Sequence, residues 1–494
     1  MAAAGLAPPG HRGYCLNYRI KSGCTGADDD AGAGQRTGVG LLQSTDNAAA
    51  AQWSSRFAFL MAAIGSSVGL GNIWKFPYMI GTGGGSAFML VYLICVLGVG
   101  LPILIAELAL GRMGRQGPIE TLIDLGRRYS GRATWGLVGC VGVLAAVLIL
   151  SFYSVVAGWS LAYIPKLLTG QMTGLSGADT GKAFGDFLAD PWALTFWHAL
   201  FMLLTIIPVA RGIQAGIEKA VVWMMPLLFA LLVLLCIYAG IEGDFVQGMT
   251  YLFKPDFGAV TWDVVLAATG QAFFSLSIGL GTMLAYGAYL PSGVSIPRTS
   301  VVIVFAAIMT AVLAGAAIFP IVFANGLNPS EGPGLVFVTL TVAFGAMPGG
   351  AVFGAVFFVL LAIAALTSSV SLLEPIVAAF SGRTRLSRSA LAWTGGIVAW
   401  VLGFLTLFSF NIWSDVHPLG GTRTWFDWID FLTSNILLPL GGVMLALFAG
   451  WVVTREDSVK ALGFESPFLY AVWRVLVRIV APVGVVAAVV SNIV

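Results

Sequence analysis

The sequence has few charged residues. Asp, Glu, Lys and Arg together make up 10% of its 494 positions, whereas soluble domains carry about 25%. This shortage excludes an ordinary soluble enzyme. No block of basic residues is present, and the net charge of +2 gives no indication of binding to nucleic acid. The partner that this composition predicts is a lipid bilayer.

Patterns that hold a metal ion or a disulfide are also missing. The three histidines lie far apart, which argues against a histidine metal site. The five cysteines show no CxxC spacing, so we interpret them as packing residues. Catalysis inside a membrane would need clustered titratable groups, and only Glu107, Glu374 and Asp430 approach such a cluster. We therefore expect that the protein is not an enzyme.

Apolar residues are abundant and make up 58% of the sequence. Runs of about 20 apolar residues recur, each long enough to cross a bilayer core about 30 Å thick. We predict an all-α integral membrane protein with about eleven transmembrane helices. The expected spans lie near residues 54–79, 86–111, 132–163, 191–210, 217–240, 262–288, 298–323, 350–380, 389–411, 426–452 and 468–492.

The first 51 residues differ from the rest, because they contain almost no apolar run. Such a segment cannot bury enough surface to fold. We predict a disordered cytoplasmic N-terminal tail over 1–51 and a membrane domain over 52–493. Whether residues 1–50 are a genuine part of the protein stays open at this point.

The connections between spans differ in their content of Lys and Arg. The connection between the second and third spans holds five arginines, and those after the fourth and eighth spans are also basic. Because basic loops stay in the cytoplasm, we expect a multi-pass protein of the cell (plasma or inner) membrane, with its N-terminus cytoplasmic and its C-terminus extracellular or periplasmic. Two outer connections, 164–190 and 324–349, are long. The second is apolar and is either a lid over an entrance or a re-entrant connector.

The first span is interrupted in its middle by "GSSVGLGNIWKFP", and the sixth by "SLSIGLG". Gly65 and Gly69 match the GxxxG pattern of closely packed helices. The nearby Asn72, Lys75 and Pro77, together with the second interrupted span, favour unwound helices instead. In lipid, unwound backbone persists only where it lines a cavity or binds something.

Unwinding exposes carbonyl oxygens that suit a cation such as sodium, and half-helix N–H groups that suit a carboxylate. The interrupted spans are five apart, as expected for two inverted five-helix repeats. Gly-interrupted segments at matching positions of two halves indicate a transporter binding site. The repeats would cover about 54–240 and 262–452, followed by an extra helix at about 468–492.

Several stretches resemble one family of transporters. "GSSVGLGNIWKFP", "GGGSAFMLVYLICVLGVGLPILIAELALGR", "RGIQAGIEKAVVWMMPLLF", "GQAFFSLSIGLG" and "ALTSSVSLLEP" are similar to spans 1, 2, 5, 6 and 8 of the neurotransmitter:sodium symporters. The resemblance covers about residues 52–493 and points to the bacterial amino-acid transporter branch. It implies a transporter domain that uses one or two sodium ions, carries a small-molecule substrate that is an amino acid, and requires no oligomer.

The resemblance implies two sodium sites. The second site maps onto the carbonyls of Gly65, Val68 and Ala364 and the hydroxyls of Thr367 and Ser368. All five groups are suitable, so this site is expected to be intact.

The first site maps onto the Ser67 carbonyl, the Asn72 side chain, Ser275 and a position in span 7. Relatives carry Asn or Asp at that last position, and this sequence has Ala307. The first site is therefore weakened, rebuilt with Thr310 or water, or lost.

An anion pocket of the family is also incomplete. Tyr92, Gln271 and Ser275 remain, but Ala311 stands where relatives place an acid or a chloride-binding serine. Chloride dependence stays undecided.

The resemblance places a substrate carboxylate against the N–H groups around Gly69–Gly71 and the hydroxyl of Tyr153. Monoamine-carrying relatives have an aspartate at the position of Gly69, so a glycine implies a substrate with its own carboxylate, an amino acid. The lining is mainly apolar, which favours a hydrophobic one. The expected substrate-binding residues are Ser66, Ser67, Gly69, Leu70, Gly71, Ile149, Tyr153, Phe274, Ser275, Ser277, Leu280, Ser368 and Leu372.

The resemblance also implies gates. Lys75 stands in place of the family's outer arginine, with Asp430 as its partner and Phe274 as a lid. Lysine keeps the charge but loses the planar two-pronged contact of arginine. Glu107 is expected to accept hydrogen bonds from the unwound backbone of span 1.

The inner pair of the family is absent, because Ala50 and Gly382 occupy its two positions. Inner closure would then rely on Trp53, Arg56 and packing. The function implied is a sodium-coupled symporter that imports an amino acid by alternating access. The alternative is an amino-acid-binding membrane sensor on the same fold with little or no transport.

Overall fold

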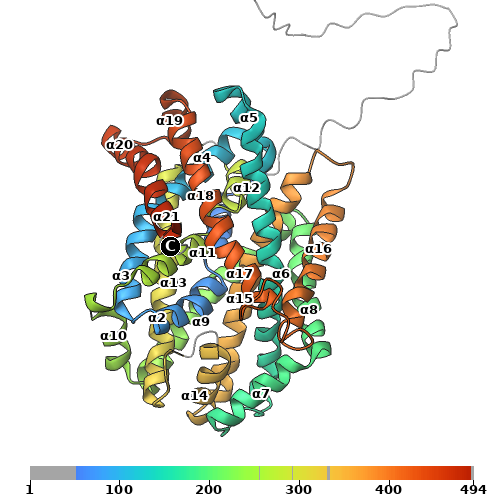
Figure 1. The fold of residues 1–494 in the computed structure, drawn as a ribbon, viewed down its shortest axis with the longest axis vertical. Coiled ribbons are helices and arrows are strands. Elements are labelled where there is room, and N and C mark those ends of the chain that lie inside the picture. The colour runs from blue at the N-terminus through green and yellow to red at the C-terminus, as the bar shows by residue number, and fades with distance from the viewer. Residues whose placement is uncertain (1–51, 255, 292, 331–333, 491–494) are drawn as a thin grey trace, which may run out of the picture. The chain divides into compact units, whose positions relative to one another are not determined.

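The computed structural model describes residues 52–490 except 255, 292 and 331–333. This part of the chain is helical and contains no β-strand (Figure 1). The predicted all-α fold class is therefore confirmed. The predicted disordered tail over 1–51 lies outside the described residues.

Eleven spans can be followed. Among the described residues, nine helices are long and apolar enough to cross a bilayer, and a pair bent by 45° forms a further span. The eleventh is the interrupted sixth span, α11 (Trp262–Leu276) with α12 (Thr282–Ala288). The others are α1 (Arg56–Ser67) with η1 (Gly71–Lys75) and α2 (Phe76–Thr82); α3 (Ser86–Cys95) with η2 (Val96–Gly100) and α4 (Leu101–Gly114); η3 (Ala133–Trp135) with α6 (Gly136–Leu168); α8 (Pro191–Ala210); η4 (Ile213–Glu218) with α9 (Lys219–Glu242); α13 (Ile296–Ala324); α15 (Gly350–Phe380); α16 (Arg388–Phe408); α17 (Trp425–Phe431) with η7 (Leu432–Leu437), α18 (Leu438–Leu447) and η8 (Phe448–Val452); and α20 (Pro467–Val475) with η9 (Leu476–Val480) and α21 (Ala481–Val490).

Short helices lie at the two ends of the bundle. The connecting helices α5 (Pro118–Ser130) and α19 (Arg455–Leu462) are at one end, and α7 (Gly177–Ala189), α10 (Phe245–Phe253) and α14 (Leu340–Ala346) are at the other (Figure 1). The connections that the sequence assigns to opposite sides of the membrane thus lie at opposite ends. The apolar connection before α14 contacts the end of span 1, where the Ser330 hydroxyl donates to the Gly81 carbonyl at 2.8 Å. Whether this connection is a lid or a simple connector stays a prediction.

Spans 1 and 6 are both broken in the middle, as predicted. Helix α1 ends where Val68 adopts an extended conformation, with φ −110° and ψ 90°. In span 6, Ser277, Gly279 and Gly281 have φ of 51°, 83° and 75°. Glycine enters this left-handed region without the clash that a Cβ atom causes. The interruptions are therefore built into the backbone, and helix α15 packs beside the first one.

A candidate cation and ligand site between the broken helices

Five oxygen atoms from α1 and α15 face one another where span 1 unwinds. The Ser368 hydroxyl donates to the Gly65 carbonyl at 3.1 Å, and the Thr367 hydroxyl donates to the Ala364 carbonyl at 3.0 Å. The Thr367 hydroxyl also lies 3.5 Å from the Val68 carbonyl. All five residues are buried. The last carbonyls of α1 have no partner within their own helix, and hydroxyls can rotate to present lone pairs, so the cluster suits a hard cation.

A cavity lies next to this cluster, between α1, α6, α11 and α15. It is lined by Ser66, Ser67, Gly69, Gly71, Asn72, Ile149, Tyr153, Phe274, Ser277, Leu280, Ser368 and Leu372. The structure thus brings together eleven of the thirteen residues proposed for substrate binding. The two others, Leu70 and Ser275, do not line this cavity, and Asn72 does.

Leu70 and Ser275 lie at the edges of this cavity. The Leu70 N–H donates to the Tyr153 hydroxyl at 3.1 Å, and the Leu70 side chain lines a separate outer cavity. The Ser275 hydroxyl accepts a hydrogen bond from the Gln271 amide at 3.2 Å. Each is therefore bound to a neighbouring group of the site rather than facing the cavity itself.

The glycines of span 1 permit close approach. A Cβ atom at Gly69 would collide with the Ser368 hydroxyl and lie 2.8 Å from the Tyr153 hydroxyl. A Cβ atom at Gly71 would lie 2.6 Å from the Phe274 ring. Both glycines thus keep the broken backbone in contact with three other elements, which explains the lack of side chains at these positions.

Glu107 is fully buried and supports span 6. Its Oε1 atom accepts a hydrogen bond from the Gly279 N–H at 2.5 Å. The sequence-based hypothesis assigned this contact to the unwound backbone of span 1, and the structure places it on span 6 instead. The error follows from symmetry, because both interruptions present free N–H groups at similar depth and the sequence does not distinguish them.

The residues expected to form the first cation site do not converge as those of the oxygen cluster on α1 and α15 do. The Asn72 amide nitrogen donates to the carbonyls of Ser67 at 3.1 Å and Ala307 at 3.2 Å. The Thr310 hydroxyl donates to the Ala306 carbonyl of its own helix at 2.8 Å. Thr310 therefore does not replace the missing ligand at position 307 in this arrangement.

The groups of the expected anion pocket are buried. The Tyr92 hydroxyl and the Gln271 side-chain oxygen have no hydrogen-bond partner among the described residues. Ala311 is fully buried and supplies no polar side chain. These observations do not decide whether transport requires chloride.

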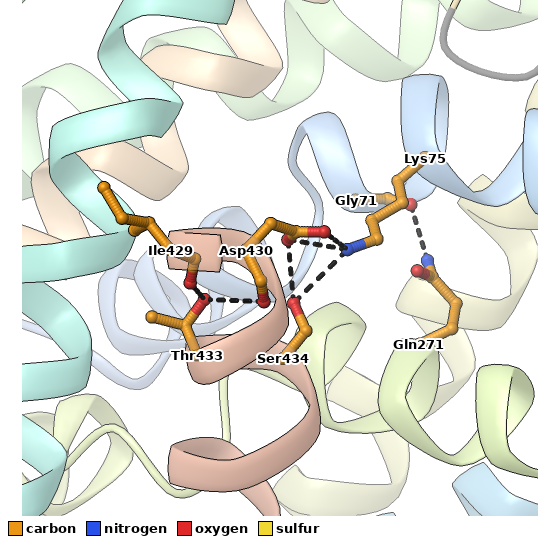
Figure 2. Close-up of polar contacts among 7 residues, drawn as sticks. All are labelled: Gly71, Lys75, Gln271, Ile429, Asp430, Thr433 and Ser434. Carbon is orange, nitrogen blue, oxygen red and sulfur yellow. Dashed lines mark hydrogen bonds and ion pairs between the residues drawn. The ribbon is translucent and has the colours of Figure 1, made fainter. Parts of the chain in front are cut away.

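An ion pair between Lys75 and Asp430 lies on the outer side of the cavity, and Figure 2 shows this pair together with Ser434. The Lys75 ammonium lies 3.1 Å and 3.4 Å from the two Asp430 carboxylate oxygens and 4.9 Å from the centre of the Phe274 ring. Ser434, which sequence reasoning missed, contacts the ammonium at 3.3 Å and donates to Asp430 at 2.9 Å. Its position one turn after Asp430 is the signal that could have identified it.

The outer cavity lies beyond this closure. It is lined by Leu70, Trp74, Lys75, Tyr78, Phe152, Tyr153, Val156, Phe274, Phe426, Asp427 and Asp430. Tyr153 and Phe274 line both cavities. These two rings therefore form the wall between the inner cavity and the outer one.

The inner side is closed by groups that the sequence reasoning mostly missed. Trp53 is buried, and its indole N–H donates to the Tyr286 carbonyl at 3.2 Å. Arg56 is exposed and has no hydrogen bond or ion pair within the described part of the chain, so it does not take part in this closure. The fully buried Glu374 carboxylate instead accepts from the Tyr289 hydroxyl at 3.0 Å and pairs with Arg388.

Comparisons with known proteins cover most of the chain. The model of the Sodium:neurotransmitter symporter family matches residues 50–180 and 175–494. The uncharacterized sodium-dependent transporter YhdH of Bacillus subtilis is 39% identical over 439 residues, which cover 88% of this chain and 96% of that protein. An uncharacterized sodium-dependent transporter of Haemophilus influenzae is 32% identical, with 91% and 100% covered. The crystal structure of MhsT in complex with L-phenylalanine matches with a TM-score of 0.84 and 40% identity, covering 89% of this chain and 99% of MhsT.

Proposed function

The chain belongs to the sodium:neurotransmitter symporter family, and on this premise we propose that it imports a hydrophobic amino acid together with sodium by alternating access. Members of this family are membrane transporters rather than enzymes, so the chain is a multi-pass membrane protein. The observation that carries the proposal is the cluster of five oxygens on α1 and α15 beside the cavity between the broken helices.

Sodium is the cation that suits the oxygen cluster. The cluster contains no sulfur or nitrogen ligand, and among the described residues no group of three or more His, Cys, Asp or Glu side chains is arranged to hold a metal. Neutral carbonyl and hydroxyl oxygens favour a hard cation. Binding there would tie α1 to α15 and stabilise one arrangement of the broken span.

The cavity supports an amino acid as the substrate. The N–H groups of Gly69 and Gly71 and the O–H of Tyr153 are suited to a carboxylate, whereas the Leu70 N–H is already bonded to the Tyr153 oxygen. Ile149, Leu280 and Leu372 provide apolar contacts. The MhsT structure was solved with L-phenylalanine, which supports a hydrophobic side chain. A pocket of this kind separates substrates that differ by one methylene by only about 1–3 kcal/mol, so we expect several hydrophobic amino acids to compete.

Alternating access would proceed by opening one closure at a time. The Lys75–Asp430 pair and Phe274 close the outer side, and Trp53 with the Glu374–Arg388 pair closes the inner side. We place the protein in the cell membrane with its N-terminus in the cytoplasm, because the basic connections lie on that side. A sodium gradient and the membrane potential would drive uptake, since each charge moved is worth about 2.3 kcal/mol per 100 mV.

The oxygen cluster is tested by the double variant Thr367→Ala, Ser368→Ala in proteoliposomes with an imposed sodium gradient. Each lost hydrogen bond to a charged group costs about 1.5–3 kcal/mol, so we expect sodium-driven uptake to fall at least about 100-fold. Ser369→Ala is the matched control, because this buried serine of α15 pairs with Thr205 instead of the cluster. Unchanged uptake by the double variant, or wild-type uptake that persists in potassium or choline, would refute the proposal.

Sensing without transport is the alternative function. The incomplete first cation site is the observation that favours it. Binding and flux measured on the same preparation separate the two, because a sensor binds a hydrophobic amino acid without accumulating it. Accumulation of the amino acid inside proteoliposomes under an inward sodium gradient would exclude the sensor.

The outer ion pair provides a further prediction. Lys75→Ala should speed release of bound amino acid to the outside about fivefold, because a partly exposed ion pair contributes about 1 kcal/mol. Lys75→Arg should behave like the wild type. Lys182→Ala is the charge-matched control, since this exposed lysine of α7 lies away from the cavities. Dissociation rates of a radiolabelled amino acid are the measurement, and equal rates in all four proteins would contradict the gating role.

A further inference from the structure

The Asn72 side chain fills the position that a first cation would take. Its amide nitrogen lies between the carbonyl oxygens of Ser67 and Ala307, at 3.1 Å and 3.2 Å. An amide nitrogen carries two N–H donors, and this geometry uses both. In the orientation described, the amide oxygen has no hydrogen-bond partner among the described residues, and the opposite orientation would direct it at two other oxygens, which repel it unless a cation lies between them. The amide nitrogen therefore serves as an electropositive group between two carbonyls.

The residues around this point fit a sodium ion poorly. A hard cation gathers about six oxygen ligands. Ala307 and Ala311 supply no side-chain oxygen, and the Thr310 hydroxyl is bonded within its own helix. The Ser275 hydroxyl already accepts from Gln271. No carboxylate of the described residues faces the position, so an ion there would stay poorly compensated.

Burial increases the cost of this shortage of oxygen ligands, because bulk water does not reach the position. Asn72, Ala307 and Thr310 are fully buried, and Ser275 is 1% exposed. Transfer of an ion to such a place costs several kcal/mol unless ligands replace its water. The cluster on α1 and α15 differs, because its two hydroxyls also reach carbonyls of the other span: Thr367 lies 3.5 Å from the Val68 carbonyl, and Ser368 lies 3.1 Å from the Gly65 carbonyl.

We propose that this chain binds one sodium ion per cycle, at the cluster of Gly65, Val68, Ala364, Thr367 and Ser368, and that the Asn72 amide replaces a first ion. The inference rests on the proposed sodium-coupled function. One sodium with a zwitterionic amino acid moves one net charge across the membrane. The amide thus holds the two carbonyls in place without a second sodium ion.

The experiment counts bound radioactive sodium per chain on the purified full-length protein, with saturating L-phenylalanine as the probe amino acid. We expect one ion per chain for the wild type. Asn72→Asp keeps the shape but replaces both N–H donors with a carboxylate, so we expect two ions per chain. Asn325→Asp is the matched control and should stay at one, because Asn325 donates to Ile321 at the end of α13, away from the site.

The outcomes separate this inference from the proposed function. Two ions per wild-type chain would overturn the single-sodium inference and leave sodium coupling intact. No bound sodium would overturn both. A folded Asn72→Asp variant that remains at one ion would refute the role of the amide. An independent measurement uses the wild-type protein in proteoliposomes. We expect about one net charge to cross the membrane for each amino acid transported.

Discussion

Replacing Gly69 with alanine is expected to weaken substrate binding and transport strongly. The added Cβ atom would collide with the Ser368 hydroxyl and approach the Ser368 Cβ and the Tyr153 hydroxyl to 2.8 Å, which is closer than real Cβ contacts. Overpacking of this kind costs about 1–3 kcal/mol. The shift would also disturb the hydrogen bond between Leu70 and Tyr153 and the hydroxyl of the oxygen cluster. We therefore expect a loss of about 5- to 150-fold in uptake.

A matched control for this variant is available within the membrane. Gly98 in span 2 has open space where a Cβ atom would be added, so Gly98→Ala should transport like the wild type. Uptake and sodium-dependent binding are measured on protein shown to be folded by its thermal midpoint. Transport by Gly69→Ala within threefold of the control would show that the Gly69, Ser368 and Tyr153 groups do not form the binding site.

Removing the Arg388 side chain should have the largest effect on stability. Its partner Glu374 has no exposed surface, whereas Arg388 is 26% exposed. Breaking a buried pair on one side leaves an uncompensated charge and costs about 3–5 kcal/mol. We expect Arg388→Ala to lower the thermal midpoint of the purified protein markedly and to weaken inner closure.

Two variants make this expectation specific. Arg383→Ala removes an ion pair with Glu120 that is more exposed on both sides, and such pairs contribute about 0–1 kcal/mol. The double variant Arg388→Leu, Glu374→Leu removes both charges and should recover part of the lost stability. A thermal midpoint for Arg388→Ala equal to that of Arg383→Ala would contradict the importance of the buried pair.

Much of the fold could be predicted because the determining signals are local. Apolar runs predict the spans, and the glycines of span 6 predict its break. In the structure, Gly279 and Gly281 at this break have positive φ. The family resemblance, confirmed by the comparisons, carries the residue assignments. The cavity brings most of the proposed substrate residues together, but their roles in binding remain predictions, as do the boundaries of the two repeats and the orientation in the membrane.

What the sequence did not reveal depends on contacts between distant segments. Glu374 is far from Tyr289 in sequence, and its pairing with Arg388 needs the turn between α15 and α16. Glu107 could have reached either interruption, and only packing decides for Gly279. The hydrogen bonds of Asn72 depend on where α13 lies, so Ala307 signalled a missing ligand without showing what replaces it.

The inner closure begins at Trp53, whose indole and backbone N–H groups reach Tyr286 and Tyr289. Because this contact joins an uncharged indole to backbone carbonyls within residues 52–490, its strength should depend little on ionic strength.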